Sequence, residues 1–262
     1  MKIQPAINYN PQNSTGEEWI DCAVQNGFKC MEIAVSQLPY EEEKQNEIIE
    51  YAKAKGLLLS LHSPYGKNNI TDTDEENRVK SIAQVKYSID LAAKHKLTVV
   101  TFHPGRLSDE NESLEEKWEM LLEVVSDIAE YAKVKKVRIG IENMEQRKNE
   151  IVYTIDDLNR FAEIGKDNPY FGVTIDFAHF SSHNIIKPDL SRLKLPVYNV
   201  HLSQGFGGKM HFPLTVENGM VDLQSVCKVL YEYEYSSFVV LETRGEQAQS
   251  KKILEAATEA FK

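Results

Sequence analysis

The stretch 171-FGVTIDFAHF-180 begins as an apolar segment and ends with two potential metal ligands. It carries no charged residue before Asp176 and is rich in Phe, Val and Ile, which is typical of a buried strand. Asp176 and His179 follow three residues apart, at the point where such a strand is expected to end. A carboxylate and an imidazole are costly to bury without partners, so we expect other parts of the chain to supply them.

Seven further apolar runs of the same kind are spaced along the 262 residues. They are short, continuous and rich in residues that favour strands, as expected for parallel strands covered on both faces. With FGVTIDF (171–177), the predicted strands are IQPAINY (3–9), CMEIAV (30–35), LLLSLHS (57–63), TVVTFH (98–103), RIGIEN (138–143), VYNVHLS (197–203) and FVVLET (238–243).

Amphipathic segments separate these runs. In residues 77–96, apolar residues recur every three or four positions and therefore share one face of a helix. Residues 113–136 and 222–235 show the same pattern, and the former begins with Ser113-x-x-Glu116, a capping-box pattern. The stretch between residues 180 and 197 contains two prolines, so only a short or irregular helix is expected there.

Eight strands alternating with helices predict an α/β chain folded as a (β/α)8 TIM barrel, with residues 1–262 as a single domain. The length suits one such barrel, and a content of 42% hydrophobic residues supports a substantial core. A doubly wound open sheet is the alternative. It usually shows a glycine-rich phosphate turn after an early strand, and the first two predicted strands have none.

Composition narrows the expected surroundings of the protein. The formal net charge of −10 disfavours broad binding to nucleic acid, although bound cations and a local basic groove can reverse the field at a site. No run approaches the roughly 20 apolar residues of a membrane span, and MKIQPAINYNPQNS lacks the features of a signal peptide. The cysteines Cys22, Cys30 and Cys227 lack CxxC spacing and fit a reducing compartment. We therefore expect a cytoplasmic protein.

Titratable side chains lie at the carboxyl ends of most of the predicted strands. Closure of the barrel would bring them together around one opening. They are His62, His103, Glu142, Asp176 with His179, His201 and Glu242, followed by His211 in the loop after the seventh strand. Any one of them alone is more often a hydrogen-bonding residue or half of an ion pair. A ring of imidazoles and carboxylates instead indicates bound cations, with zinc and manganese the leading candidates beside iron and cobalt.

The order of these motifs, from LHSPY (61–65) to LETR (241–244), resembles the xylose isomerase-like barrel superfamily. That superfamily includes sugar isomerases, sugar epimerases and AP endonucleases of the endonuclease IV type. The resemblance implies that the metal site common to the superfamily consists of Glu142, Asp176, His201 and Glu242. It further implies that the two glutamates of an epimerase lie on opposite sides of the sugar and move the proton, and that His179 is the histidine of the DxxH pattern.

For the endonuclease IV branch, the resemblance implies a further zinc bound by His62 and His103, with Glu142 bridging two metals. A third zinc would be bound by a DxH pair that includes His211. In this chain the pair reads KMH (209–211), so Lys209 replaces the aspartate. A charged lysine cannot be a zinc ligand, and this departure argues against a trinuclear phosphodiesterase site.

Four further residues are candidates for substrate binding. Lys209 and Arg244 are candidates for contact with a phosphate or carboxylate, the alternative for Lys209 being a solvated loop lysine. Tyr65 matches a tyrosine that endonuclease IV uses near its DNA, and it would equally pack on a sugar ring. Glu32 resembles the glutamate of the VEL or IEL motif in the sugar isomerase-like branch, with a structural ion pair as its alternative. The segment GFGG (205–208) predicts a mobile loop that closes over the site.

The first functional hypothesis is a divalent-metal-dependent isomerase or epimerase acting on a small sugar or sugar phosphate. It would transfer a proton through an enediolate, with Glu142 or Glu242 as the base and the other returning a proton. The alternative is a zinc-dependent phosphodiesterase of the endonuclease IV type, which His62 and His103 favour and Lys209 disfavours. A barrel that binds metal or sugar without catalysis is the third class.

The expected partners follow from the first hypothesis. They are a small-molecule sugar or sugar phosphate rather than a nucleic acid, and no membrane. Dimers and tetramers are common in the isomerase-like branch, so a homo-oligomer is compatible with the resemblance.

Overall fold

Eight parallel strands pair in a closed ring in the computed structural model, which describes residues 3–12 and 14–261. Their order around the ring is β1-β10-β7-β6-β5-β4-β3-β2, and β1 pairs with β10 to close it. The predicted (β/α)8 TIM barrel is thus confirmed. Met1, Lys2, Asn13 and Lys262, which belong to the predicted domain, lie outside the described residues.

The eight predicted strands all form, and most are slightly shorter at their ends than predicted. Because helices cover their outer faces and neighbouring side chains fill the interior, β6 is buried along its whole length. The barrel strands are β1 (Gln4–Tyr9), β2 (Cys30–Ala34), β3 (Leu58–His62), β4 (Val100–Phe102), β5 (Ile139–Glu142), β6 (Phe171–Asp176), β7 (Val197–Leu202) and β10 (Phe238–Leu241).

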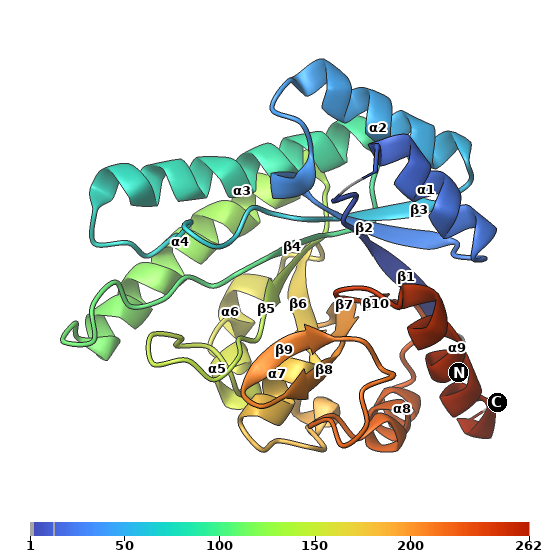
Figure 1. Ribbon diagram of the computed structural model, residues 1–262. Coiled ribbons are helices and arrows are strands. Elements are labelled where there is room, and N and C mark those ends of the chain that lie inside the picture. The colour runs from blue at the N-terminus through green and yellow to red at the C-terminus, as the bar shows by residue number, and fades with distance from the viewer. Residues whose placement is uncertain (1–2, 13, 262) are drawn as a thin grey trace.

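Helices surround the ring of strands, and the last of them, α9, lies beside β1 (Figure 1). The α-helices are α1 (Gly16–Gln25), α2 (Glu42–Ala54), α3 (Glu75–His95), α4 (Leu114–Lys135), α5 (Ile155–Asn159), α6 (Ala162–Gly165), α7 (Phe177–Ser182), α8 (Leu223–Glu232) and α9 (Gln247–Thr258). Short 3₁₀ turns are η1 (Val35–Gln37), η2 (Leu190–Arg192) and η3 (Glu259–Phe261). No helix among the described residues has the length and apolar character needed to cross a membrane.

The helix predictions agree with the structure. Helices α3, α4 and α8 occupy the three amphipathic segments, and the Ser113 side chain accepts a hydrogen bond from the Glu116 N–H at 3.3 Å, as its position predicted. The stretch between α7 and β7, which is fully described, contains only the turn η2. The apolar core lies mainly between the barrel and these helices.

The segment after β7 differs from the prediction. Where a mobile loop over the site was predicted, β8 (Gln204–Phe206) and β9 (Lys209–Phe212) form an antiparallel hairpin that contacts α7, and its closure over the site stays a prediction. Gly207 and Gly208 make its turn with φ angles of 58° and 77°. Glycine adopts this left-handed region without steric cost, which explains why the glycines permit a tight turn here.

Polar side chains fill part of the barrel interior below the mouth. The Asn199 amide donates hydrogen bonds to Glu32 Oε2 at 2.7 Å and to Thr101 Oγ1 at 2.9 Å. The Thr101 hydroxyl lies 2.9 Å from that of Thr174, and all four residues are nearly inaccessible to solvent. Buried polar groups are stable only when they are hydrogen-bonded, so this network forms an ordered polar floor beneath the site.

Candidate functional site

The titratable residues predicted at the strand ends do gather at the carboxyl end of the barrel. His62, Glu142 and Asp176 are the last residues of β3, β5 and β6. His201 is the next-to-last residue of β7 and pairs in register with Asp176, while Glu242 directly follows β10. Parallel strands end on the same rim, and this is why residues far apart in sequence meet there.

The first ligand group consists of Glu142, Asp176, His201 and Glu242. Each offers one ligand atom, and these atoms all lie within 4.8 Å of one another. His201 Nδ1 lies 3.0 Å from Glu142 Oε1 and 3.2 Å from Glu242 Oε2. Asp176 Oδ2 is buried without a hydrogen-bond partner. Three carboxylates around one imidazole, with one carboxylate oxygen unpartnered, fit a divalent cation.

The His201 imidazole carries the positive charge of this group when no metal is bound. Burial alone would lower the pKa of His201, but Glu32 and Glu142 outweigh burial and raise it well above its usual value. For the carboxylate of Glu142, burial alone would raise the pKa. His201 and the neighbouring imidazoles outweigh burial and hold the pKa of Glu142 well below its usual range. Burial raises the pKa of Asp176, and repulsion from the nearby carboxylates of Glu142 and Glu242 raises this pKa further.

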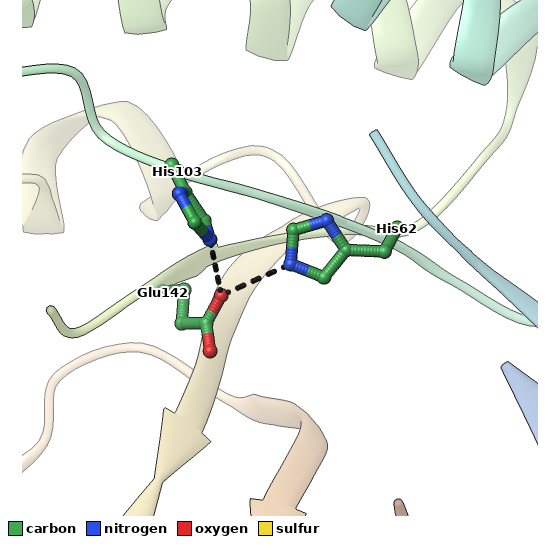
Figure 2. A group of neighbouring side chains, drawn as sticks. All are labelled: His62, His103 and Glu142. Atoms are coloured by element: carbon green, nitrogen blue, oxygen red, sulfur yellow. Dashed lines mark hydrogen bonds and ion pairs between the residues drawn. The ribbon is translucent and has the colours of Figure 1, made fainter. Parts of the chain in front are cut away.

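The second ligand group consists of His62, His103 and Glu142, whose potential ligand atoms also lie within 4.8 Å of one another. Figure 2 shows both imidazoles directed at the same carboxylate oxygen of Glu142. The Nε2 atoms of His62 and His103 lie 3.3 and 3.2 Å from Glu142 Oε2. His62 Nδ1 is 2.8 Å from the carbonyl oxygen of Ser63, which favours a proton on Nδ1 and leaves Nε2 available.

His179 and His211 lie beside the first group without belonging to either group of potential ligands among the described residues. His179 Nδ1 is 2.8 Å from the Asn143 carbonyl, and its Nε2 is 3.7 Å from Asp176 Oδ2. The His179 and His211 rings are 6.0 Å apart, and both line the cavity at the barrel mouth. His211 Nδ1 is buried without a hydrogen-bond partner and lies 3.8 Å from Glu242 Oε2.

The four candidate substrate-binding residues are placed differently from one another. Tyr65 lines the mouth cavity, with its ring stacked on His103 at a centroid distance of 5.7 Å. Arg244 also lines the cavity, from the loop that follows the end of β10 at Leu241. Lys209 is exposed at the start of β9 and is absent from the described lining of the cavity.

Glu32, the fourth candidate, is only 3% exposed and forms an ion pair with His201. Glu32 Oε1 lies 2.9 Å from His201 Nε2, on the side of the ring opposite the first ligand group. The structure therefore has the arrangement that the sequence analysis gave as the alternative for this residue, an ion pair inside the barrel.

The cavity above the ligand groups has a volume of about 600 Å³ and is open to solvent. Asn8, at the end of β1, lines it, and the buried carbonyl oxygen of its side chain has no hydrogen-bond partner. Residues from the loops after β3, β4, β5 and β10 complete much of the wall, and four of them carry positive charge: Arg106, Arg147, Lys148 and Arg244.

Sequence reasoning missed Asn8 and the loop residues. Asn8 was detectable, because it lies at the carboxyl end of a predicted strand like the other site residues. Arg106 and Arg147 were not, because loop residues follow no hydrophobic period that would reveal which way they point. Burial raises the pKa of Glu150, another missed loop residue on the cavity wall, to about 7, although Arg106 and Arg147 oppose the shift.

Comparisons with known proteins agree with this geometry. Residues 20–262 match the family described as xylose isomerase-like TIM barrel. An uncharacterized protein of Methanocaldococcus jannaschii is 25% identical over 225 residues, which cover 82% of this chain and 79% of that protein. A probable endonuclease 4 of Acholeplasma laidlawii is 26% identical over 144 residues, which cover 54% of this chain and 48% of that protein.

Solved structures also resemble this chain. A D-tagatose 3-epimerase-like protein superimposes with a TM-score of 0.83 at 19% sequence identity, covering 99% of this chain and 98% of that one. At this identity the likeness shows a shared fold, and the chemistry has to be argued from the residues at the mouth of the barrel.

Proposed function

The chain belongs to the xylose isomerase-like TIM barrel family, and from that premise we propose that it is a divalent-metal-dependent sugar isomerase or epimerase. One observation carries the proposal. Glu142, Asp176, His201 and Glu242 bring four ligand atoms within 4.8 Å of one another, and Glu242 also lines the open cavity. A metal site that shares a carboxylate with a substrate-sized cavity suits proton transfer next to a carbonyl.

Zinc or manganese would be held by the four residues of the first ligand group. When bound there, such a cation supplies Lewis-acid chemistry that polarises a substrate carbonyl and acidifies the adjacent C–H. The buried Asp176 and His201 serve only to hold it, since neither is among the residues that line the cavity in the described part of the chain.

Glu242 is the better placed of the two glutamates to take the proton from the substrate. Its side chain is 21% exposed toward the cavity, whereas the side chain of Glu142 is 1% exposed. Burial opposes ionisation of Glu242, but His211 and His201 outweigh it and hold its pKa below the usual range. Glu242 is therefore ionised at neutral pH, in the form that accepts a proton. Glu142 is not among the described residues that line the cavity, so it would return a proton through a relayed water.

The cavity wall supports a polar, hydroxyl-bearing substrate. The unpartnered oxygen of Asn8 is suited to a hydroxyl donor, and the Tyr65 ring to the apolar face of a sugar. Arg244 lines the cavity, and its guanidinium has no hydrogen bond or ion pair with the described residues. It would donate hydrogen bonds to a phosphate or carboxylate of the substrate, so sugars and sugar phosphates both belong in a substrate panel.

Deuterium exchange tests the proposed reaction. The full chain is stripped of metal, reloaded with manganese or zinc, and incubated in D₂O with a panel of ketoses, aldoses and their phosphates. We expect at least one substrate to be isomerised with deuterium incorporated at the carbon next to the carbonyl, and the chelator-treated protein to be inactive. Turnover without deuterium in any product, at every reaction time, would contradict the proton-transfer route.

The second candidate function is a zinc-dependent phosphodiesterase of the endonuclease IV type. The observation that favours it is the second ligand group, because Glu142 would bridge two cations with His62 and His103 holding the second. The relative named probable endonuclease 4 adds support. Lys209 and the net charge of −10 count against it.

Metal content and cleavage of DNA distinguish the two candidates. The isomerase predicts one cation bound tightly per chain, whereas the phosphodiesterase predicts two or three zinc ions in protein purified without chelator. Cleavage of a duplex that contains an abasic site, lost in Glu142→Gln, would establish the phosphodiesterase. Cleavage that persists in Glu142→Gln would exclude both the endonuclease assignment and a role for this carboxylate.

A further inference from the structure

We propose that Glu32 is a positioning residue that fixes the orientation and tautomer of His201, so that the imidazole presents Nδ1 to a bound cation. The inference rests on the metal site of the proposed function. It assigns Glu32 to the support of a ligand, in place of the substrate contact that its sequence motif suggested.

The His201 ring is held between carboxylates on both sides. Nδ1 faces Glu142 Oε1 at 3.0 Å and Glu242 Oε2 at 3.2 Å, which belong to the first ligand group. Nε2 faces Glu32 Oε1 at 2.9 Å. The ring is 0% exposed, so no solvent molecule competes for either nitrogen. Only one nitrogen of a neutral imidazole has a free lone pair, and the partner of the other nitrogen decides which it is.

Glu32 on β2 accepts hydrogen bonds from its neighbour β3 and from β7 across the barrel. Its Oε2 accepts from the Ser60 hydroxyl at 3.0 Å and from the Asn199 amide at 2.7 Å. Both oxygens of Glu32 therefore have partners within the barrel, and the side chain is 4% exposed. A carboxylate fixed in this way can orient the ring that it contacts, because it has no second position to adopt.

A competing contact makes the assignment of the proton a real choice. The Asn199 amide nitrogen lies 3.1 Å from His201 Nε2 and would donate to it if that nitrogen had no proton. That arrangement would put the proton on Nδ1, facing the first ligand group. The contact from His201 Nε2 to Glu32 is shorter than the contact to Asn199, and its acceptor is a charged carboxylate. Charge-assisted hydrogen bonds are about twice as strong as neutral ones. When a cation takes the place of the Nδ1 proton, the remaining proton therefore stays on Nε2.

The consequence concerns metal affinity. With the proton on Nε2, the Nδ1 lone pair points at the position shared by Glu142 and Glu242. Carboxylates that accept the second N–H of a ligating histidine typically contribute about 10- to 100-fold to metal affinity. We expect Glu32 to contribute within that range although it is no metal ligand itself.

Zinc affinity of the chelator-treated full chain tests this, measured by competition with a chromophoric chelator. Glu32→Gln keeps an acceptor oxygen but loses the charge, and is expected to weaken zinc binding about tenfold. Glu32→Leu loses both and is expected to weaken it about 100-fold. Ser88→Ala is the control, because it removes a buried hydrogen bond within α3 that involves neither Glu32 nor His201, and its affinity should stay within about threefold of wild type.

A second measurement separates positioning from folding. In the zinc-loaded protein, ¹⁵N NMR of the histidine rings should show the His201 proton on Nε2. Thermal unfolding of each chelator-treated variant reports whether it folds, and Glu32→Gln carries the test if Glu32→Leu does not. A folded Glu32→Gln that binds zinc as tightly as wild type, or a His201 proton on Nδ1, would overturn the inference. Wild-type protein that binds no zinc would instead contradict the proposed function.

Discussion

Glu142 joins the two ligand groups, because each of its carboxylate oxygens faces one of them. Oε1 lies 3.0 Å from His201 Nδ1, and Oε2 lies 3.2 to 3.3 Å from the imidazoles of His103 and His62. Its side chain is 1% exposed. A buried carboxylate with imidazoles on both oxygens is suited to bind metal, whereas Glu242, at the cavity surface, is suited to meet substrate.

Substitution of Glu242 tests this division of roles. Glu242→Gln removes the proposed base and one metal ligand, and we expect deuterium exchange to fall by about 10²- to 10⁴-fold even with saturating metal. The control is Glu163→Gln on the outer helix α6, where the carboxylate forms an exposed ion pair with Lys166, and exchange should be unchanged. A Glu242→Gln variant with the wild-type rate would exclude Glu242 as the base.

Substitution of Asp176 is expected to have opposite effects on the stability of the metal-free protein and on metal binding. Its buried Oδ2 lacks a hydrogen-bond partner, and burial together with neighbouring carboxylates raises the pKa of Asp176. Asp176→Asn removes that charge and keeps an oxygen to cap α7, so we expect the chelator-treated variant to be about 1 kcal/mol more stable than wild type.

The same variant should lose metal-dependent stabilisation. Thermal unfolding with chelator and with excess zinc measures both effects on one sample. Zinc should raise the melting temperature of wild type much more than that of Asp176→Asn. An equal zinc-induced increase in the two proteins would show that Asp176 is not a ligand.

At the scale of elements, the junction between β6 and α7 explains the spacing of Asp176 and His179 in FGVTIDFAHF. Asp176 is both the last residue of β6 and the N-cap of α7, and its Oδ1 accepts the backbone N–H of His179 at 2.9 Å. The spacing of three residues is therefore the geometry of a helix cap. Oδ2 remains free of this cap and faces the metal-binding position.

Helix α4 provides a test of local stability that is separate from the site. Ser113 caps this helix through the backbone N–H of Glu116. Ser113→Ala is expected to lower the free energy of unfolding by about 1 kcal/mol, measured by urea denaturation, while Ser113→Asp retains the cap and stays near wild type. Zinc affinity should be the same in all three proteins, and a loss of affinity in Ser113→Ala would show that α4 contributes to the site.

The elements also show how far the sequence predicts this structure. The strands were predictable because buried parallel strands are continuous apolar runs, and the gathering of titratable residues at one rim was predictable because the ends of barrel strands converge. The grouping of Glu142, Asp176, His201 and Glu242 was implied by the family resemblance. The hairpin of β8 and β9 was not predicted, since glycines mark a turn without showing whether the flanking residues pair. The roles of loop residues such as Arg106 depend on tertiary contacts that no local pattern encodes.

For the whole molecule, the proposed metal site implies competition between protons and metal for the same buried residues. Burial disfavours a charged His62, but Glu142 and nearby carboxylates outweigh burial and raise its pKa to about 9. The pKa values of His179 and His201 are raised for the same reason. The metal-free protein therefore holds protons at neutral pH that a cation would displace.

This competition predicts a pH dependence of stability. A histidine whose folded pKa lies above its unfolded value of about 6.5 stabilises the fold fully below that pH and loses this contribution as pH rises through the folded pKa, which is about 9 for His62. We expect the free energy of unfolding of chelator-treated protein to fall between about pH 7 and 9.5. Zinc affinity should rise over the same range. Urea unfolding with and without zinc measures both, and a stability that is constant or rises would contradict the raised pKa values.

The position of a bound metal tests directly whether Glu142, Asp176, His201 and Glu242 form a metal site. A crystal of the zinc-loaded protein, with diffraction recorded on either side of the zinc absorption edge, locates the ion by its anomalous signal. We expect the anomalous peak of zinc to be enclosed by the side chains of Glu142, Asp176, His201 and Glu242. A zinc ion bound elsewhere, with these four side chains free of metal, would contradict it.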